Sequence, residues 1–160
     1  MDFEHPEFRE HRAAQLELLD RLQIPHVTLE GRYSLDAIRR LYRRAAALLL
    51  QRPESFGMPI AECFATGAWV VIPHSGWAMA WRLDDAPRQH GPGRLGESFV
   101  AYDGLDDLAD RLRSLQAAHD PVRTPREVHA RFLATYPSFW SGDRAALAGF
   151  LDRAARGGLG

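Results

Sequence analysis

The sequence predicts an α/β fold, an open and mostly parallel sheet with helices on both faces. Short runs of β-favouring residues alternate with helical patterns along the chain. Two of these runs, residues 46–51 (AALLLQ) and 69–73 (WVVIP), are apolar almost throughout, as is typical of parallel strands buried on both faces. With 160 residues, 46% of them hydrophobic, we expect one ordered domain that spans residues 1–160.

The first third of the chain combines two helical patterns with a strand pattern. Leucines recur at helical spacing over residues 7–23, which predicts a helix. Residues 26–30 (HVTLE) are predicted to form a short strand. Ser34 is a candidate N-cap for a helix over residues 35–45. Four arginines fall on the polar side of this helix, where a solvated face or a phosphate-binding patch are the alternatives: Arg39, Arg40, Arg43 and Arg44.

The remaining elements follow the same alternation. A helix is predicted to begin at Pro59 and to stop before Gly67, because proline suits the first helical position and glycine the residue past the end. Residues 74–96 lack periodicity, residues 98–102 (SFVAY) predict a strand, and residues 105–115 predict a helix. Residues 124–127 have the pattern of a capping box. Ser141 is the candidate cap of a final helix with four inward residues: Leu147, Phe150, Leu151 and Ala154.

The composition excludes several classes of protein. A net charge of −1 gives no electrostatic basis for a nucleic-acid partner. The longest apolar run has six residues, whereas a membrane-spanning helix needs about 20. The polar N-terminus does not resemble a signal peptide, so we expect a cytoplasmic protein without a transmembrane segment. All 20 basic residues are arginine, which excludes Schiff-base and Walker-type lysines. The single cysteine, Cys63, is predicted to be a small buried hydrophobe.

Ligands of open parallel sheets bind beyond the carboxyl ends of the strands, so the strand-to-helix loops are the places to search. Residues 91–96 (GPGRLG) match G-x-G-x-x-G, but no strand precedes them and no helix follows, so a dinucleotide role is not expected. The better candidate is the loop over residues 52–57. The first backbone N–H groups of the next helix, those of Gly57, Met58 and Ile60, are expected to be available to an anion.

Two carboxylates accompany this loop. Glu62 lies one turn into the helix, opposite the apolar face, and its side chain is expected to lean toward the helix start and accept hydrogen bonds from sugar hydroxyls. Glu54 precedes it by eight positions, on the loop. The alternative is a pair of exposed glutamates beside an ordinary turn.

Residues 54–71 (ESFGMPIAECFATGAWVV) resemble the retaining GT-B glycosyltransferases of the family-4 type, which typically contain Glu-Gly-Phe-Gly-Leu-Pro-x-x-Glu-Ala-x-Ala-x-Gly-x-Pro-Val-Val. The resemblance covers residues 26–152 and includes residues 137–140 (PSFW), which are similar to an element before the family's last, crossover helix, here within residues 137–160. It implies a Rossmann-like domain, half of a GT-B fold. The implied activity is hexosyl transfer from a nucleotide-diphosphate sugar without a bound metal.

The resemblance also implies roles for individual residues. Glu54 would contact the hydroxyls of the donor sugar as the catalytic residue, and Glu62 would contact the ribose. Backbone amides of Phe56, Gly57 and Met58 would approach the sugar and the diphosphate.

The chain departs from the family pattern at three points. An acceptor domain is absent, and the first strand of the donor domain with its basic loop has no counterpart before residue 7. The family's Gly-Gly-x-x-Glu loop here contains Ser75 and Gly76 but lacks one glycine and the acidic residue. We therefore expect a donor-binding domain that is not catalytically complete alone.

Several alternatives remain. His74 is a candidate ligand or general acid beside Ser75 and Gly76. Trp77 and Trp81 are candidates for stacking on a base or sugar, with packing in a lid or against another domain as the alternative. The alternative function is a non-catalytic module derived from a glycosyltransferase, in which a second chain covers an exposed sheet edge. A flavodoxin-like receiver domain is disfavoured because its acidic cluster and lysine are missing.

Overall fold

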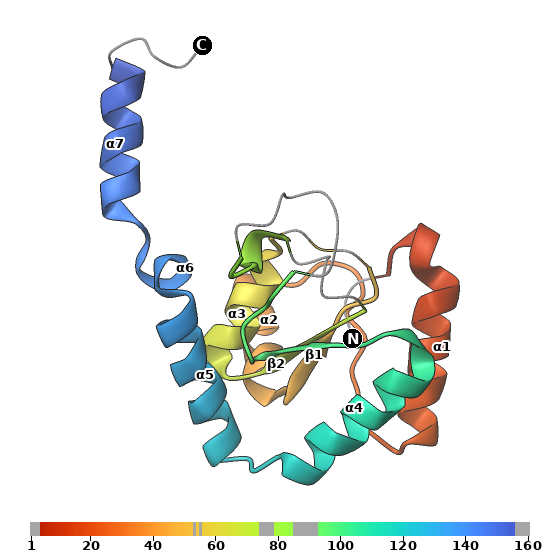
Figure 1. Cartoon of the computed structure of the whole chain (residues 1–160). Helices are drawn as coiled ribbons and strands as arrows, with labels where there is room; N and C mark the ends of the chain where they lie inside the picture. The colour runs from red at the N-terminus through yellow and green to blue at the C-terminus, as the bar shows by residue number, and fades with distance from the viewer. Residues whose placement is uncertain (1–3, 53, 55, 74–78, 85–92, 156–160) are drawn as a thin grey trace.

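The sheet at the centre of the molecule has three parallel strands. The computed structural model describes residues 4–52, 54, 56–73, 79–84 and 93–155. The strands β1 (Ala47–Leu49), β2 (Trp69–Ile72) and β3 (Phe99–Ala101) lie in the order β1-β2-β3 (Figure 1). Ala47 lies opposite Trp69, and Val70 lies opposite Phe99. The predicted α/β class and the parallel sheet are therefore confirmed.

Helices cover both faces of this sheet. The helices α1 (Arg9–Arg21) and α4 (Gly104–Ala118) lie on one face, and α2 (Leu35–Arg44), α3 (Met58–Thr66) and α5 (Arg123–Thr135) lie on the other (Figure 1). Alternate strand residues point to opposite faces. Leu49 and Val71 accordingly pack in one core cluster, and Leu48 and Val70 in the other. The shorter elements are η1 (Pro6–Phe8), η2 (Met79–Trp81), α6 (Pro137–Ser141) and α7 (Arg144–Ala155).

Two helix boundaries were well predicted because their signals are local. Ser34 caps α2, and its Oγ accepts a hydrogen bond from the Ala37 N–H at 3.3 Å. The helix α3 begins one residue before Pro59 and ends at Gly67, whose φ of +84° is readily adopted by glycine. The arginines of α2 lie on an exposed face, as the solvated alternative predicts.

The strand predicted over residues 26–30 is wrong. These residues form no regular element, although Leu29 is buried in the core and only 4% exposed. A strand needs a neighbouring strand for its backbone hydrogen bonds, and among the described residues β1 pairs with β2 alone. Val27, at 58% exposure, faces outward instead.

The N-caps predicted for two helices in the C-terminal part of the chain are also wrong. Thr124 lies inside α5, and the Asp120 carboxylate accepts hydrogen bonds from the N–H groups of Val122 and Arg123 at 2.9 and 2.6 Å. Ser141 is the last residue of α6 and donates to the Pro137 carbonyl.

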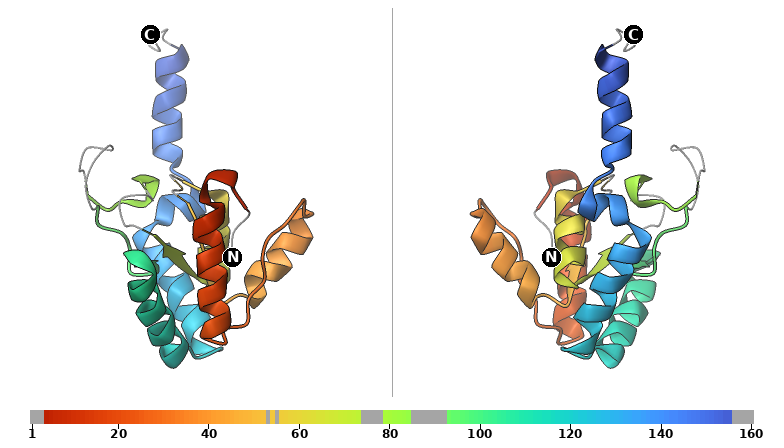
Figure 2. Two further views of the ribbon diagram at one scale, coloured as in Figure 1. Left: turned by 90° about the vertical axis from the view of Figure 1, so that its right-hand side faces the viewer. Right: turned by 90° about the vertical axis from the view of Figure 1, so that its left-hand side faces the viewer.

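The helix α7 extends away from the body of the molecule (Figure 2). Its Leu147 and Leu151 are 58% and 55% exposed, so the predicted inward packing of these two side chains is wrong. For Phe150 and Ala154 the structure describes the helical backbone but not the side chains. No helix in the described ranges has both the length and the apolar content needed to cross a bilayer.

Candidate functional site

The loop between β1 and α3 folds back on the start of the helix. Gly57 has a φ of +57°, which glycine adopts without strain. A Cβ atom at this position would lie 2.5 Å from Glu54 Cγ and 3.3 Å from Ile60 Cδ1. The Glu54 side chain therefore lies directly against the Gly57 backbone, and glycine is needed for this contact as well as for the turn.

The two predicted carboxylates have different surroundings. Glu54 Oε2 lies 3.6 Å from Arg52 Nη2, and the Glu54 side chain is 26% exposed. Glu62 is half-buried one turn into α3 and forms no ion pair with any described residue. Both carboxylates are thus held on or beside the first turns of α3, and their approach to a common ligand stays a prediction.

The helix start offers fewer free amides than the sequence predicts. The Ile60 N–H donates to the Gly57 carbonyl at 2.9 Å, so the prediction that it is available to an anion is wrong. Within the described ranges, the N–H groups of Gly57 and Met58 donate to no acceptor. The Met58 side chain is 61% exposed, which leaves this end of the helix open to solvent.

An aromatic cluster holds the loop from behind at Phe56. The indole N–H of Trp81 donates to the Phe56 carbonyl at 2.5 Å, and the Phe56 ring stacks on Trp81 and on Phe139. Trp81 is fully buried, and the Tyr136 hydroxyl donates to its carbonyl at 2.7 Å. Trp81 is therefore a residue of the chain's own core that positions the loop, and both predictions for it, stacking on a ligand and packing in a lid or against another domain, are wrong. No local sequence pattern indicates this cluster, because its members come from distant segments.

A polar network at the same ends of the strands was not predicted. Gln15, fully buried on α1, donates to the Leu50 carbonyl at 3.1 Å and to the Tyr102 hydroxyl at 2.6 Å. The Leu50 carbonyl is free for this contact because Pro73, which follows β2, has no N–H. Tyr102 Oη also lies 3.0 Å from His11 Nε2. Burial raises the pKa of Tyr102 to about 12 and lowers the pKa of His11, so both side chains are neutral near pH 7.

Two buried side chains near this network retain unmet hydrogen-bonding groups. Gln51, which follows β1, is fully buried, and neither its Nε2 nor its Oε1 has a partner among the described residues. Arg12 lies one turn before Gln15 and contacts Glu4 at 3.4 Å through Nη1, while its Nε and Nη2 have no partner in the same part of the chain. Such groups are rare in protein interiors. They place unused donors at the end of the sheet that carries the loop.

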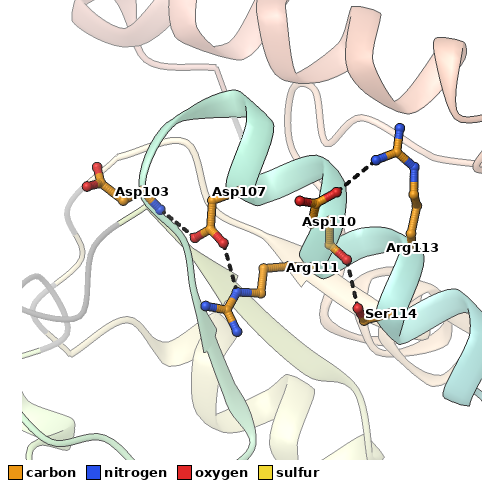
Figure 3. Close-up of polar contacts among 6 residues, drawn as sticks. All are labelled: Asp103, Asp107, Asp110, Arg111, Arg113 and Ser114. Carbon is orange, nitrogen blue, oxygen red and sulfur yellow. Dashed lines mark hydrogen bonds and ion pairs between the residues drawn. The ribbon is translucent and has the colours of Figure 1, made fainter.

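The acidic residues of α4 form a solvated helix face. Asp107 accepts hydrogen bonds from the Asp103 N–H and from Arg111 Nε, and Asp110 accepts one from Arg113 Nη1 (Figure 3). Carboxylates near a helix N-terminus and exposed ion pairs are sufficient to explain this cluster.

Some predicted site residues lie outside the described residues: His74, Ser75, Gly76 and Trp77. Of residues 91–96, the structure describes 93–96, and there the Gly96 N–H donates to the Tyr136 hydroxyl at 2.7 Å. Cys63 is fully buried, as expected. Within the described part of the chain, no three His, Cys, Asp or Glu side chains gather as metal ligands.

Comparison of the chain with family models, with curated proteins and with solved structures finds no match. The structure is that of an α/β domain with a strand-to-helix loop at the carboxyl ends of the strands of a parallel sheet.

Proposed function

We propose that this chain is the donor-binding domain of a retaining GT-B glycosyltransferase of the family-4 type and binds a nucleotide-diphosphate sugar. The observation that carries the proposal is the start of α3, where the Glu54 side chain lies against Gly57 beside two backbone N–H groups that have no acceptor among the described residues. A helix N-terminus attracts anions, and a neighbouring carboxylate accepts hydrogen bonds from sugar hydroxyls.

The parts of the ligand are assigned to separate groups. The N–H groups of Gly57 and Met58 would bind the diphosphate, Glu54 the hydroxyls of the sugar, and Glu62 the hydroxyls of the ribose. The Phe56 backbone, fixed by the Trp81 hydrogen bond, holds the turn in place. Sugar transfer would in addition require groups that bind the acceptor. The site is assigned no metal, because amides and arginines supply the positive potential.

Isothermal titration calorimetry of the purified chain with UDP, GDP and the corresponding nucleotide-diphosphate sugars tests this proposal. We expect saturable binding at submillimolar to millimolar ligand. Glu62→Ala should weaken binding by about 1.5 to 3 kcal/mol, the value of a hydrogen bond that involves a charged group. Glu17→Ala, which removes an exposed carboxylate from α1, is the matched control and should leave the affinity unchanged.

Two results would contradict the proposal. One is the absence of binding at millimolar ligand while circular dichroism shows an intact fold. The other, which concerns the ribose assignment alone, is an equal affinity for the Glu62→Ala and Glu17→Ala variants.

A second candidate function is favoured by the open side of β1. In the described residues this strand has a partner strand on one side only. An unpaired edge is a site for association with another chain, so a non-catalytic assembly module is the alternative. This alternative function would be contradicted if the folded chain did not self-associate in sedimentation velocity and did not bind the heptapeptide used in the next subsection.

A further inference from the structure

A cavity of about 590 Å³ lies along the open edge of β1. Ala47, Leu48 and Leu49 of the strand line it, together with parts of α2, α4 and the segment over residues 24–29. The lining also includes Ala46, Trp69 and Val71, so the cavity runs the length of β1. The loop that contains Glu54 follows the carboxyl end of β1, and none of its described residues lines the cavity.

This cavity lies between the two helix layers. Leu48 and Tyr42, which belong to the core cluster on one face of the sheet, line it from one side. Leu49 and Leu112, which belong to the cluster on the other face, line it from the other side. Since both layers reach past β1, the cavity occupies the plane of the sheet, where a further strand would lie. We call it the edge slot.

Backbone groups of β1 face the edge slot. The Trp69 N–H donates to the Ala46 carbonyl and the Leu50 N–H donates to the Val71 carbonyl, both at 2.9 Å. Successive residues of a strand direct their backbone groups to opposite sides, so those of Ala47 and Leu49 face away from β2. The edge slot therefore combines apolar walls with a row of backbone donors and acceptors.

Arg44 is the one permanently charged residue among the described residues that line the edge slot. The lining also contains His26 and His119, and the Asp20 carboxylate, outside the lining, lies 3.9 Å from His26 Nε2. In the described part of the chain, no carboxylate forms an ion pair with Arg44. Arg44 ends α2, just before the amino end of β1, so the electrostatic complement is a segment with an acidic residue at that end.

We propose that the edge slot binds one extended polypeptide segment, apolar on both faces and acidic at the end beside Arg44, as an added strand beside β1. The strand would pair with Ala47 and Leu49 and place its side chains against both helix layers, as in recognition by β-augmentation. The edge of a second folded copy does not fit, because its own helices would meet α2 and α4. This inference rests on the second candidate function and not on nucleotide binding.

A matched pair of heptapeptides tests the proposal on the full chain. The first has Glu at each end and Val and Ile between, and the second has the same side chains with two alternate backbone amides N-methylated. Loss of two hydrogen bonds should weaken binding by about tenfold or more. Amide exchange measured by NMR should show new protection at Ala47 and Leu49 when the first peptide binds.

Two variants locate the binding. Leu115→Glu places a carboxylate in the edge slot and should abolish peptide binding. Leu105, on the same helix and similarly half-buried against the same core cluster, does not line the edge slot. Leu105→Glu is therefore the control and should leave peptide binding unchanged in the folded protein.

Equal binding of the two peptides would overturn the proposal and indicate a site for a small apolar molecule. Lack of binding by the first peptide to the folded chain would also overturn it. Because the nucleotide titration uses another ligand and other residues, none of which lines the edge slot, its failure and the failure of the peptide test are distinguishable.

Discussion

Gly57 serves two purposes that can be separated experimentally. Its positive φ lets the chain enter α3, and its missing side chain leaves room for Glu54. Gly31 has a comparable φ of +72° but no atom within 4 Å of where its Cβ would be. Substitution of Gly31 therefore measures backbone strain alone, whereas substitution of Gly57 adds the steric displacement of the Glu54 carboxylate.

We predict that Gly57→Ala destabilises the fold more than Gly31→Ala does. Each substitution places alanine at positive φ, at a cost of about 1 to 2 kcal/mol, and only Gly57→Ala also displaces Glu54. Urea denaturation measures both free energies of unfolding. In a Glu54→Ala background most of the extra cost of Gly57→Ala should disappear, and the part caused by Ile60 Cδ1, 3.3 Å from the added Cβ, should remain. An undiminished extra cost in that background would mean that Glu54 does not contact Gly57.

At the scale of the element, the start of α5 shows how a cap can lie outside the expected pattern. Asp120 precedes the helix by three residues. Its carboxylate accepts hydrogen bonds from the N–H groups of Val122, the N-cap residue, and of Arg123, the first residue of the helix. The hydrogen bond from Arg123, and then that from Val122, lowers the pKa of this carboxyl below its ordinary value of 3.8. The ionised form is therefore the one that stabilises the helix.

Asp120→Ala is expected to lower stability at neutral pH, and the difference from the unaltered chain should shrink in acid. Because the pKa is depressed in the folded state, this contribution is present above the unfolded pKa and is lost as the pH falls through the folded pKa. Urea midpoints at about pH 7 and about pH 3 measure this change. Glu127→Ala tests the capping-box interpretation and should have little effect. A larger loss for Glu127→Ala than for Asp120→Ala would restore that interpretation.

On the scale of the whole molecule, the two core clusters form without the described side chains of α7. These clusters join the sheet to α1–α5, Phe139 of α6 packs against one of them, and no described side chain of α7 belongs to either. Both views in Figure 2 show this helix standing away from the body. Its exposed leucines therefore contribute little of the apolar burial that stabilises a fold.

Removal of residues 144–160 should change the free energy of unfolding by less than about 1 kcal/mol, because full burial of a single leucine already contributes about 1.5 to 3 kcal/mol. Leu108→Ala, at a fully buried position, is the control and should cost about 2 to 5 kcal/mol. Chemical denaturation of both proteins measures the two effects. A loss on truncation as large as that of Leu108→Ala would mean that α7 packs on the body in solution.

Local signals determined the elements that the sequence predicts correctly. Gly67 fixes the end of α3, Ser34 caps α2, and unbroken apolar runs mark β1 and β2, since each depends on residues that are neighbours in the chain. The same signals locate the loop that carries Glu54, although they cannot show that Ile60 already uses its N–H.

Tertiary structure decided what depends on distant partners. Residues 26–30 have a strand pattern, but no strand of the described ranges lies beside them. Trp81 is fixed in the core by a carbonyl 25 positions earlier, and Gln15 joins a hydroxyl 87 positions later. The edge slot likewise exists only because two helix layers extend past β1. A sequence pattern records the preference of a segment, whereas hydrogen bonding and burial are satisfied by the whole chain at once.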